Sequence, residues 1–383
     1  MAQHVRTAGL VVHSSGKVAP GEAVREVADA IGGRRLAGGL LFCSHTYPRE
    51  PLAAAVREQL AGFPLIGCTS AGELSTRGYD ENSLVFIGFP ADDFAMDVLA
   101  FDDLDHFAVD EARDRVRQLA AAAGLASRRL GEPVHRAALF LVDGLSHREE
   151  LLTMTIQEAL GDTLMVGGSS GDGMNFGETG VLVDGRFDRD SAVLAILSST
   201  RPMHVFCEHQ YRAGEERMVV TAADPQARVV HEINALPAAE EYARVAGRHG
   251  SALDAAFFAS HPPMVRAGGR FHVRSIQAAN ADGSLTFYGA IDTGIVLRVG
   301  EPLDRVGEVD ALLGRVAAEV GEIDHVIGFD CVLNRIDAEN RQIARAMSRL
   351  FAERRVVGFN TYGEQFRAAH INQTLAGLAI GVG

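Results

Sequence analysis

Short apolar runs alternate with stretches of helical periodicity along most of this chain. Residues 39–43 predict a buried strand, and Leu52, Val56 and Leu60 then fall on one face of a helix. Apolar runs at 64–67 and 84–89 complete this first copy. A second copy has strands at 138–142, 164–167 and 192–197 and a helix at 149–160, and a third has strands at 325–331, 356–358 and 374–380 and a helix at 339–352. The chain therefore contains an internal repeat.

The repeat predicts the fold class. Strand, helix and strand within about 30 residues is the size of a βαβ unit. We expect an α/β protein of two related halves with mixed β-sheets and covering helices, built from repeated strand-helix-strand-strand units. The N-terminal half is placed at 1–222 and the C-terminal half at 223–383, because a new β-rich pattern starts after the second copy closes.

A segment of small and polar residues follows the second strand of each copy. The three segments are "GCTSAGE" (67–73), "VGGSSGDG" (166–173) and "VGFNTYGE" (357–364). We expect them to be loops at carboxyl strand ends, where α/β sheets bind ligands and where small residues let a ligand approach the backbone. Plain turns are the alternative interpretation. The candidate ligand-binding residues are Cys68, Thr69, Ser70, Glu73, Ser169, Ser170, Asp172, Asn360, Thr361, Tyr362, Glu364 and Asn372.

Three of these candidates are carboxylates in matching places. Glu73 and Glu364 end the first and third segments, and Asp172 stands near the same position in the second. A carboxylate at this point would suit the amine of an amino-acid-like ligand. The alternative, which we favour slightly, is a carboxylate that caps backbone N–H groups.

Composition and charge exclude several classes of partner and site. Of the 383 residues, 47% are hydrophobic, and the formal charge is −14 without any Lys/Arg stripe. Nucleic acid and anionic membranes are therefore poor partners. No apolar run approaches the ~18 residues of a membrane span, and residues 1–12 lack the apolar region of a secretory leader. We expect a cytoplasmic protein without membrane insertion. The four cysteines form no C-x-x-C pair, which argues against a zinc knuckle or covalently attached haem.

The segments, read with their neighbours, resemble a known family. "PLIGCTSAGE", "VGGSSGDGMNF", "VVHEINALPAAEEY", "VVGFNTYGEQF" and "HINQTLAGLAIG" are similar to the FIST proteins, with a FIST N half followed by a FIST C half. The resemblance covers the chain from about residue 30. It implies a non-catalytic bacterial sensor of small ligands in signal transduction.

The last motif, together with "GFDCVLNRID", also resembles the nitric-oxide-sensing (NosP) subgroup of that family. This second resemblance implies haem b, nitric oxide as the gaseous ligand and a partner histidine kinase in a two-component system. It leaves a homo-oligomer open. The expected axial ligand is His370, with His209 and His204 as alternatives and Tyr362 and Cys331 as weaker ones. A structural histidine is the commoner role of each.

Two other functions are kept open. The second is a sensor of an amino-acid-like molecule without haem. The third is a serine hydrolase, because residues 167–171 fit G-x-S-x-G with Ser169 as the nucleophile. Against the third stands the β-like stretch that follows this segment, where a nucleophile elbow requires a helix. Asn360, which is no nucleophile, also occupies the equivalent position of the third copy.

Overall fold

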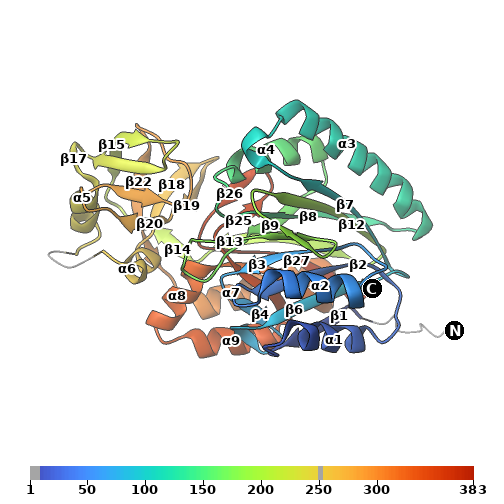
Figure 1. The fold of residues 1–383 in the computed structure, drawn as a ribbon. Helices are drawn as coiled ribbons and strands as arrows, with labels where there is room; N and C mark the ends of the chain where they lie inside the picture. Colours follow the sequence, from blue (N-terminus) through green and yellow to red (C-terminus); the bar gives the residue numbers. More distant parts are fainter. Residues whose placement is uncertain (1–8, 249–252) are drawn as a thin grey trace.

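The protein is described by a computed structural model that covers residues 9–248 and 253–383. Three units of one design build most of it (Figure 1). Unit 1 consists of β1 (Val11–Ser15), α1 (Pro20–Ile31), β2 (Leu36–Ser44), α2 (Arg49–Gln59), β3 (Leu65–Ser70), β4 (Glu73–Ser75), β5 (Gly78–Asp80) and β6 (Leu84–Pro90). Unit 2 consists of β7 (Phe94–Phe101), η1 (Leu104–His106), α3 (Val109–Ala126), η2 (Ser127–Arg129), β8 (His135–Val142), α4 (Glu149–Leu160), β9 (Met165–Ser169), β10 (Val181–Val183), β11 (Arg186–Asp188) and β12 (Ala192–Ser199).

Unit 3 has the same order of elements but is interrupted. It consists of β13 (Met203–His209), α7 (Arg305–Val320), β23 (Ile323–Cys331), α8 (Val332–Asn340), α9 (Ala344–Glu353), β24 (Val356–Thr361), β25 (Glu364–Phe366), β26 (Ala369–Ile371) and β27 (Thr374–Gly381). Between β13 and α7, where the other units have short connections, lies a separate lobe at 211–302, which we call the insert (Figure 1).

The insert has its own nine-stranded sheet and its own apolar core. Its elements are β14 (Tyr211–Ala213), β15 (Met218–Asp224), β16 (Val229–Ile233), β17 (Leu236–Pro237), α5 (Ala238–Val245), α6 (Ala255–Ser260), β18 (Pro263–Ala267), β19 (Arg270–Val273), β20 (Ile276–Ala279), β21 (Leu285–Phe287) and β22 (Val296–Pro302). β20 pairs with β21 around the Asp282-Gly283 turn. Because β14 pairs with β22, the two ends of the insert lie side by side.

Each unit forms a six-stranded mixed sheet that is completed by another unit. The strand orders are β1-β6-β2-β3-β10-β11, β7-β12-β8-β9-β25-β26 and β13-β27-β23-β24-β4-β5. Each unit contains a short hairpin: β4-β5 in unit 1, β10-β11 in unit 2 and β25-β26 in unit 3. The hairpin of unit 2 joins the sheet of unit 1, that of unit 3 joins the sheet of unit 2, and that of unit 1 joins the sheet of unit 3. This exchange closes the three units into a ring.

One apolar core is shared by the three sheets. Phe42, Leu139 and Phe329, each from the first parallel strand of its unit, meet in this core, and Phe359 lies with its ring centroid 4.6 Å from that of Phe42 and 5.7 Å from that of Phe329. Alternate residues of the same strands point outward, where helices of the same unit cover them. Strands buried on both faces explain the near-continuous apolar runs in the sequence.

The predicted mixed α/β fold built on a repeated unit is confirmed. The predicted boundary between residues 222 and 223 falls within β15. Within the described residues, no helix is long and apolar enough to cross a membrane. The first eight residues, on which part of the expectation about a leader rests, lie outside the described ranges.

Two expectations about individual elements are wrong. The helix predicted at 339–352 is two helices, α8 and α9, because Gln342 adopts a left-handed conformation with φ of 59° between them. The small-residue segments are not loops in their first halves, since residues 67–70, 167–169 and 358–361 belong to β3, β9 and β24. Small polar residues occupy these strands for reasons that the site geometry explains.

Candidate functional site

The glycine that opens each segment is required by strand packing. Gly67, Gly167 and Gly358 pair in register with equivalent positions of the parallel neighbouring strands. A Cβ atom on these glycines would lie 1.8, 1.7 and 1.9 Å, respectively, from a backbone carbonyl oxygen of that neighbour. The three positions are thus structurally equivalent, as predicted, and the repeated glycine serves close approach of two strands.

The three segments meet one another in the ring. Ala71 N donates to Asn360 O at 3.0 Å, and Gly171 N donates to Thr69 O at 3.0 Å. Tyr362 N donates to the carbonyl oxygen of Ser169 at 3.3 Å, which joins the third segment to the second. Direct backbone hydrogen bonds therefore join the three segments to one another.

The candidate side chains, in contrast, are occupied within the protein. Twelve residues were predicted as ligand-binding, and all are buried. Cys68 packs in the shared core, Thr69 accepts from Gly180 N, Ser169 accepts from Gln365 Nε2, Ser170 accepts from Gly144 N, Asn360 donates to Asp330, and Asn372 donates to Tyr362 O. Their role in ligand binding stays a prediction.

Glu73 and Glu364 form matching internal clamps. Glu364 accepts a hydrogen bond from the Thr361 hydroxyl, and its second oxygen accepts from Thr374 N at 3.0 Å and Thr374 Oγ1 at 2.7 Å. Glu73 makes the same contacts with Ser70 and with the backbone and hydroxyl of Ser83. Burial raises the pKa of Glu73 to about 7 and that of Glu364 to about 8. Both clamps tie the segment to the closing strand of its unit.

Asp172 organises the chain that follows the second segment. Its carboxylate accepts from the backbone N–H groups of Phe176 at 2.9 Å, Gly177 at 2.9 Å and Glu178 at 2.7 Å, and from the Tyr362 hydroxyl. Partial burial raises the pKa of Asp172, but the hydrogen bonds, led by the one from Tyr362, outweigh burial, and the pKa is lowered. A carboxylate capping N–H groups is the interpretation that the sequence favoured.

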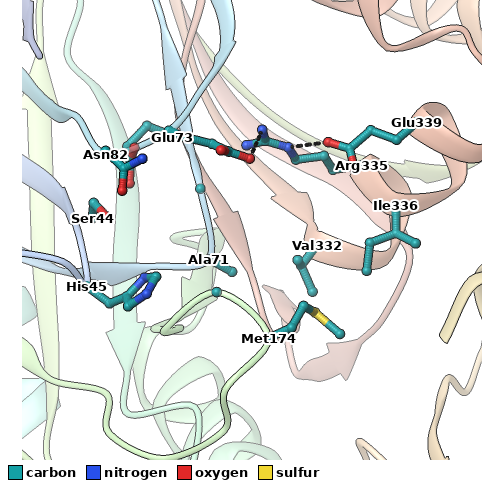
Figure 2. Close-up of a pocket in the computed structure, with 13 residues that line it drawn as sticks. Ser44, His45, Ala71, Glu73, Asn82, Met174, Val332, Arg335, Ile336 and Glu339 are labelled. Atoms are coloured by element: carbon teal, nitrogen blue, oxygen red, sulfur yellow. Dashed lines mark hydrogen bonds and ion pairs between the residues drawn. The ribbon is translucent and has the colours of Figure 1, made fainter.

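A pocket of about 280 Å³ opens beside the meeting point of the segments (Figure 2). Its lining residues are Ser44, His45, Ala71, Gly72, Glu73, Glu81, Asn82, Gly173, Met174, Val332, Arg335, Ile336 and Glu339. Figure 2 shows the apolar side chains of Met174, Val332 and Ile336 grouped below Arg335. The pocket thus lies between segments one and two and helix α8 of unit 3, and its size suits a small metabolite.

Arg335 is the central charge of this pocket. Its Nη2 pairs with Glu81 at 2.7 Å and its Nε with Glu339 at 3.0 Å, while Nη1 donates to the carbonyl oxygen of Asp80 at 2.9 Å. The guanidinium is well buried, with 11% of the side chain exposed, whereas the Glu81 and Glu339 side chains are 64% and 51% exposed. A buried cation is therefore held by two carboxylates that can swing into solvent.

The candidate haem ligands lie outside this pocket. The His370 ring is buried, and a Cβ on Gly363 would come within 2.8 Å of its Nε2 atom, so the backbone of residue 363 packs against that nitrogen. Burial lowers the pKa of His370. His209 is engaged through both nitrogens, by Phe271 O at 2.9 Å and Tyr211 N at 3.3 Å. His204 lies half-buried on the same strand, β13.

A haem needs an open apolar face at its axial nitrogen. Neither His370 nor His209 presents one in this structure. Two aromatic residues of the third segment are also engaged within the protein: Phe359 is in the shared core and Tyr362 hydrogen-bonds Asp172. Tyr362 and Cys331, the weaker ligand alternatives, are buried in a common apolar cluster. His370, His209, Tyr362 and Cys331, as placed, do not fit the role of axial haem ligand.

Ser169 does not stand in a nucleophile elbow. It ends β9, it is 1% exposed, and its hydroxyl accepts from an amide rather than donating to a base. Among the described residues, no group of three or more His, Cys, Asp or Glu side chains is placed to hold a metal ion.

Comparison with known proteins identifies the family of this chain. Residues 37–236 match the FIST N domain and residues 238–367 match the FIST C domain. The chain belongs to the FIST family, whose domains are small-ligand sensors in signalling and generally non-catalytic. No curated protein matches the chain at a significant level.

Sequence reasoning missed most of the pocket because it looked for polar side chains within the segments. Only Glu73 of the twelve candidates lines it. Arg335 was not identified because residues 332–338 were not assigned to a helix. The available signal was position: α8 follows the carboxyl end of β23 directly, at the sheet edge where ligands were expected.

Proposed function

We propose that the chain senses a small molecule carrying both a carboxylate and an amine, such as an amino acid, and binds it in the pocket around Arg335. One observation carries the proposal: a well-buried guanidinium is paired with Glu81 and Glu339, which are themselves mostly exposed. Arginine binds carboxylates in bidentate geometry, and a ligand carboxylate can take the place of these two side chains.

The remaining pocket residues complement the rest of such a ligand. When Glu81 or Glu339 is displaced from Arg335, its carboxylate becomes available to the ligand ammonium group. The apolar surface of Val332 and Ile336 receives a short side chain. A monovalent acid or a simple amine would satisfy only half of this arrangement, so the pocket favours molecules with both charges.

Amino acids are expected to raise the melting temperature of the purified protein. A ligand at one hundred times its Kd stabilises the folded state by ~2.7 kcal/mol, which corresponds to several degrees. The measurement is a thermal-shift screen of the twenty L-amino acids, with propionate and propylamine as half-ligands. Arg335→Gln should abolish the shift, while Arg345→Gln, an exposed arginine on α9, should retain it. The assignment of the pocket would be refuted if amino acids shifted the melting temperature of both variants equally. It would also be refuted if propionate and propylamine each gave a shift as large as that of an amino acid.

Haem b and nitric oxide remain the alternative that the sequence resemblance supports. Protein purified from haem-supplied cells would then show a Soret band that moves when nitric oxide is added. His370→Ala should abolish that band without loss of folding if His370 is the axial ligand. A colourless protein that responds to amino acids eliminates this alternative, and a retained band in the variant transfers the assignment to His209 or His204.

In either case we propose a cytoplasmic signalling partner, with a histidine kinase as the first candidate. Membership of a family of signalling sensors supports a partner in general. The kinase itself rests on the sequence resemblance alone. Retention of a histidine kinase on the immobilised full-length chain tests it, and a kinase that is not retained under any ligand condition contradicts it.

A further inference from the structure

Residues 172–178, which we call the strap, connect the pocket to the insert. At one end Gly173 and Met174 line the pocket, and the Met174 side chain is 40% exposed. Two residues further on, the ring of Phe176 lies between two tyrosines, with centroids 4.7 Å from Tyr362 and 5.8 Å from Tyr288. Tyr288 belongs to the insert, so one short stretch of chain contacts both places.

The strap is held in a strained conformation. Phe176 has φ of 52°, in the left-handed region that costs a bulky L-residue roughly 1–2 kcal/mol. Asp172 compensates for this strain because its carboxylate accepts the N–H groups of Phe176, Gly177 and Glu178. Backbone strain of this kind is typically stored at ligand clamps and switch regions.

Tyr288 lies next to an ion-pair contact between the insert and unit 2. Tyr288 donates its N–H to Ser275 O at 3.0 Å, and its carbonyl oxygen accepts from Arg228 Nη1 at 2.5 Å. Arg228 in turn pairs with Glu149 at 2.7 Å and Glu150 at 2.8 Å on α4 of unit 2. The Phe176 ring therefore packs beside one of the points at which the insert is anchored to the ring of units. Gln373 of unit 3 provides another, through its hydrogen bonds with Ser275 and Ala259.

We propose that the strap is a switch: occupation of the pocket displaces Met174, Phe176 leaves its place between the tyrosines, and the insert loosens from the ring of units. The inference rests on the proposed function of the pocket as the ligand site. The ligand drives the change because it binds more tightly to the strap conformation in which Met174 does not occupy the ligand's position. The change also relieves the backbone strain at Phe176, which leaves the left-handed region. The insert is then the output element of the sensor.

A tethered probe tests the switch without the natural ligand. Met174→Cys is modified with 2-aminoethyl methanethiosulfonate, which places a short ammonium-bearing chain in the pocket. Burial raises the thiol pKa of each native cysteine, so the introduced thiol reacts first. Hydrogen–deuterium exchange is then measured by mass spectrometry. We expect the peptide containing Tyr288 to exchange about tenfold faster after modification.

The controls separate the switch from simple damage. Leu125→Cys, an exposed position on α3, carries the same label and should leave exchange at Tyr288 unchanged. Phe176→Gly, which relieves the strain and removes the ring, should show fast exchange at Tyr288 before labelling and no further change when combined with labelled Met174→Cys. Phe176→Leu tests the same point in a less flexible backbone.

The outcomes distinguish this inference from the proposed function. Unchanged exchange at Tyr288 in labelled Met174→Cys overturns the switch. The switch is also overturned if labelling of Met174→Cys speeds exchange at Tyr288 equally in proteins with Phe176 and with Phe176→Gly. Amino acids that still raise the melting temperature in that case leave the ligand assignment intact. If exchange at Tyr288 becomes faster after labelling but no amino acid binds, the strap is supported as a switch and the proposal of an amino-acid ligand is rejected.

Discussion

Fragments 1–222 and 223–383 are expected to be unfolded when they are produced separately and to form a folded complex when they are mixed. The hairpin exchange is the reason. Fragment 1–222 lacks β25 and β26, which complete the sheet of unit 2, and it lacks Phe329 and Phe359 of the shared core. Fragment 223–383 lacks β13, β4 and β5, the outer strands of the sheet of unit 3. Losses on this scale exceed the roughly 5–15 kcal/mol by which a domain is stable.

Circular dichroism and thermal unfolding of each fragment and of the mixture provide the measurement. Removal of the insert is the matched control, because it deletes a segment of chain but leaves the ring of units closed. Residues 214–299 are replaced by a short Gly-Ser linker, which the pairing of Ala213 with Gly300 allows. This variant should still unfold cooperatively. Cooperative unfolding of fragment 1–222 alone would show that the ring is not the folding unit.

The repeated unit could be predicted because its signal is local. Apolar runs buried on both faces and helices with one apolar face are properties of consecutive residues, and they fix strand and helix type. The hairpin exchange could not be predicted in this way. Strands such as β4 and β10 have three residues each, and nothing in so short a stretch says which sheet supplies its partner. Their pairing is decided by the closure of the ring, which is a property of the whole chain.

The candidate site shows the same limit. The sequence located two segments that line the pocket, the first and the second, but small polar residues can face either a ligand or a strand-rich interior. The Thr69 side chain turns inward because the neighbouring unit supplies the N–H group of Gly180, whereas the Asn360 side chain turns inward to the carbonyl oxygen of Asp330 in its own unit. Arg335 gained its importance from Glu81, which lies more than 250 residues away along the chain.

Glu364→Gln is expected to stabilise the protein at pH 8 and to change its stability little at pH 5. Burial raises the pKa of Glu364 from 4.5 to about 8. Between these values the folded protein binds a proton that the unfolded chain has lost, so this group's contribution to stability falls as pH rises, by up to ~1.4 kcal/mol per pH unit. Glutamine has no ionised form whose burial would be costly, so the stability of the variant does not fall in this way as pH rises. Its advantage at pH 8 should be on the order of 3 kcal/mol.

The hydrogen bonds explain why glutamine can replace the acid. Thr374 donates both its N–H and its hydroxyl to one carboxyl oxygen of Glu364, a role that an amide oxygen also fills. The other oxygen faces the Thr361 hydroxyl, which donates to it when Glu364 is a carboxylate. A hydroxyl group can also rotate to accept, so Thr361 can accept from an amide N–H as it would from a protonated carboxyl group.

At Glu73 the protonated form is favoured by a count of hydrogens. Ser70 has one hydroxyl hydrogen, yet it lies within hydrogen-bonding distance of both Cys43 O, at 3.0 Å, and Glu73. If Ser70 donates to Cys43, Glu73 must donate to Ser70. Glu73→Gln should therefore behave like Glu364→Gln, with its pH dependence ending near pH 7, where the pKa of Glu73 lies.

Urea unfolding of the wild type and the variants at pH 5, 6, 7 and 8 measures these effects. Glu319→Gln, at an exposed position on α7, is the control, and its difference from the wild type should be small at every pH. Glu364→Ala should be destabilised at every pH, because Thr374 and Thr361 lose their partner, typically by ~1–3 kcal/mol for each buried group left unpaired. The opposite result for glutamine, a loss of stability that is largest at pH 8, would mean that Glu364 is ionised in the folded protein. The two clamps would then be sites of buried charge rather than neutral ties between the segments and their closing strands.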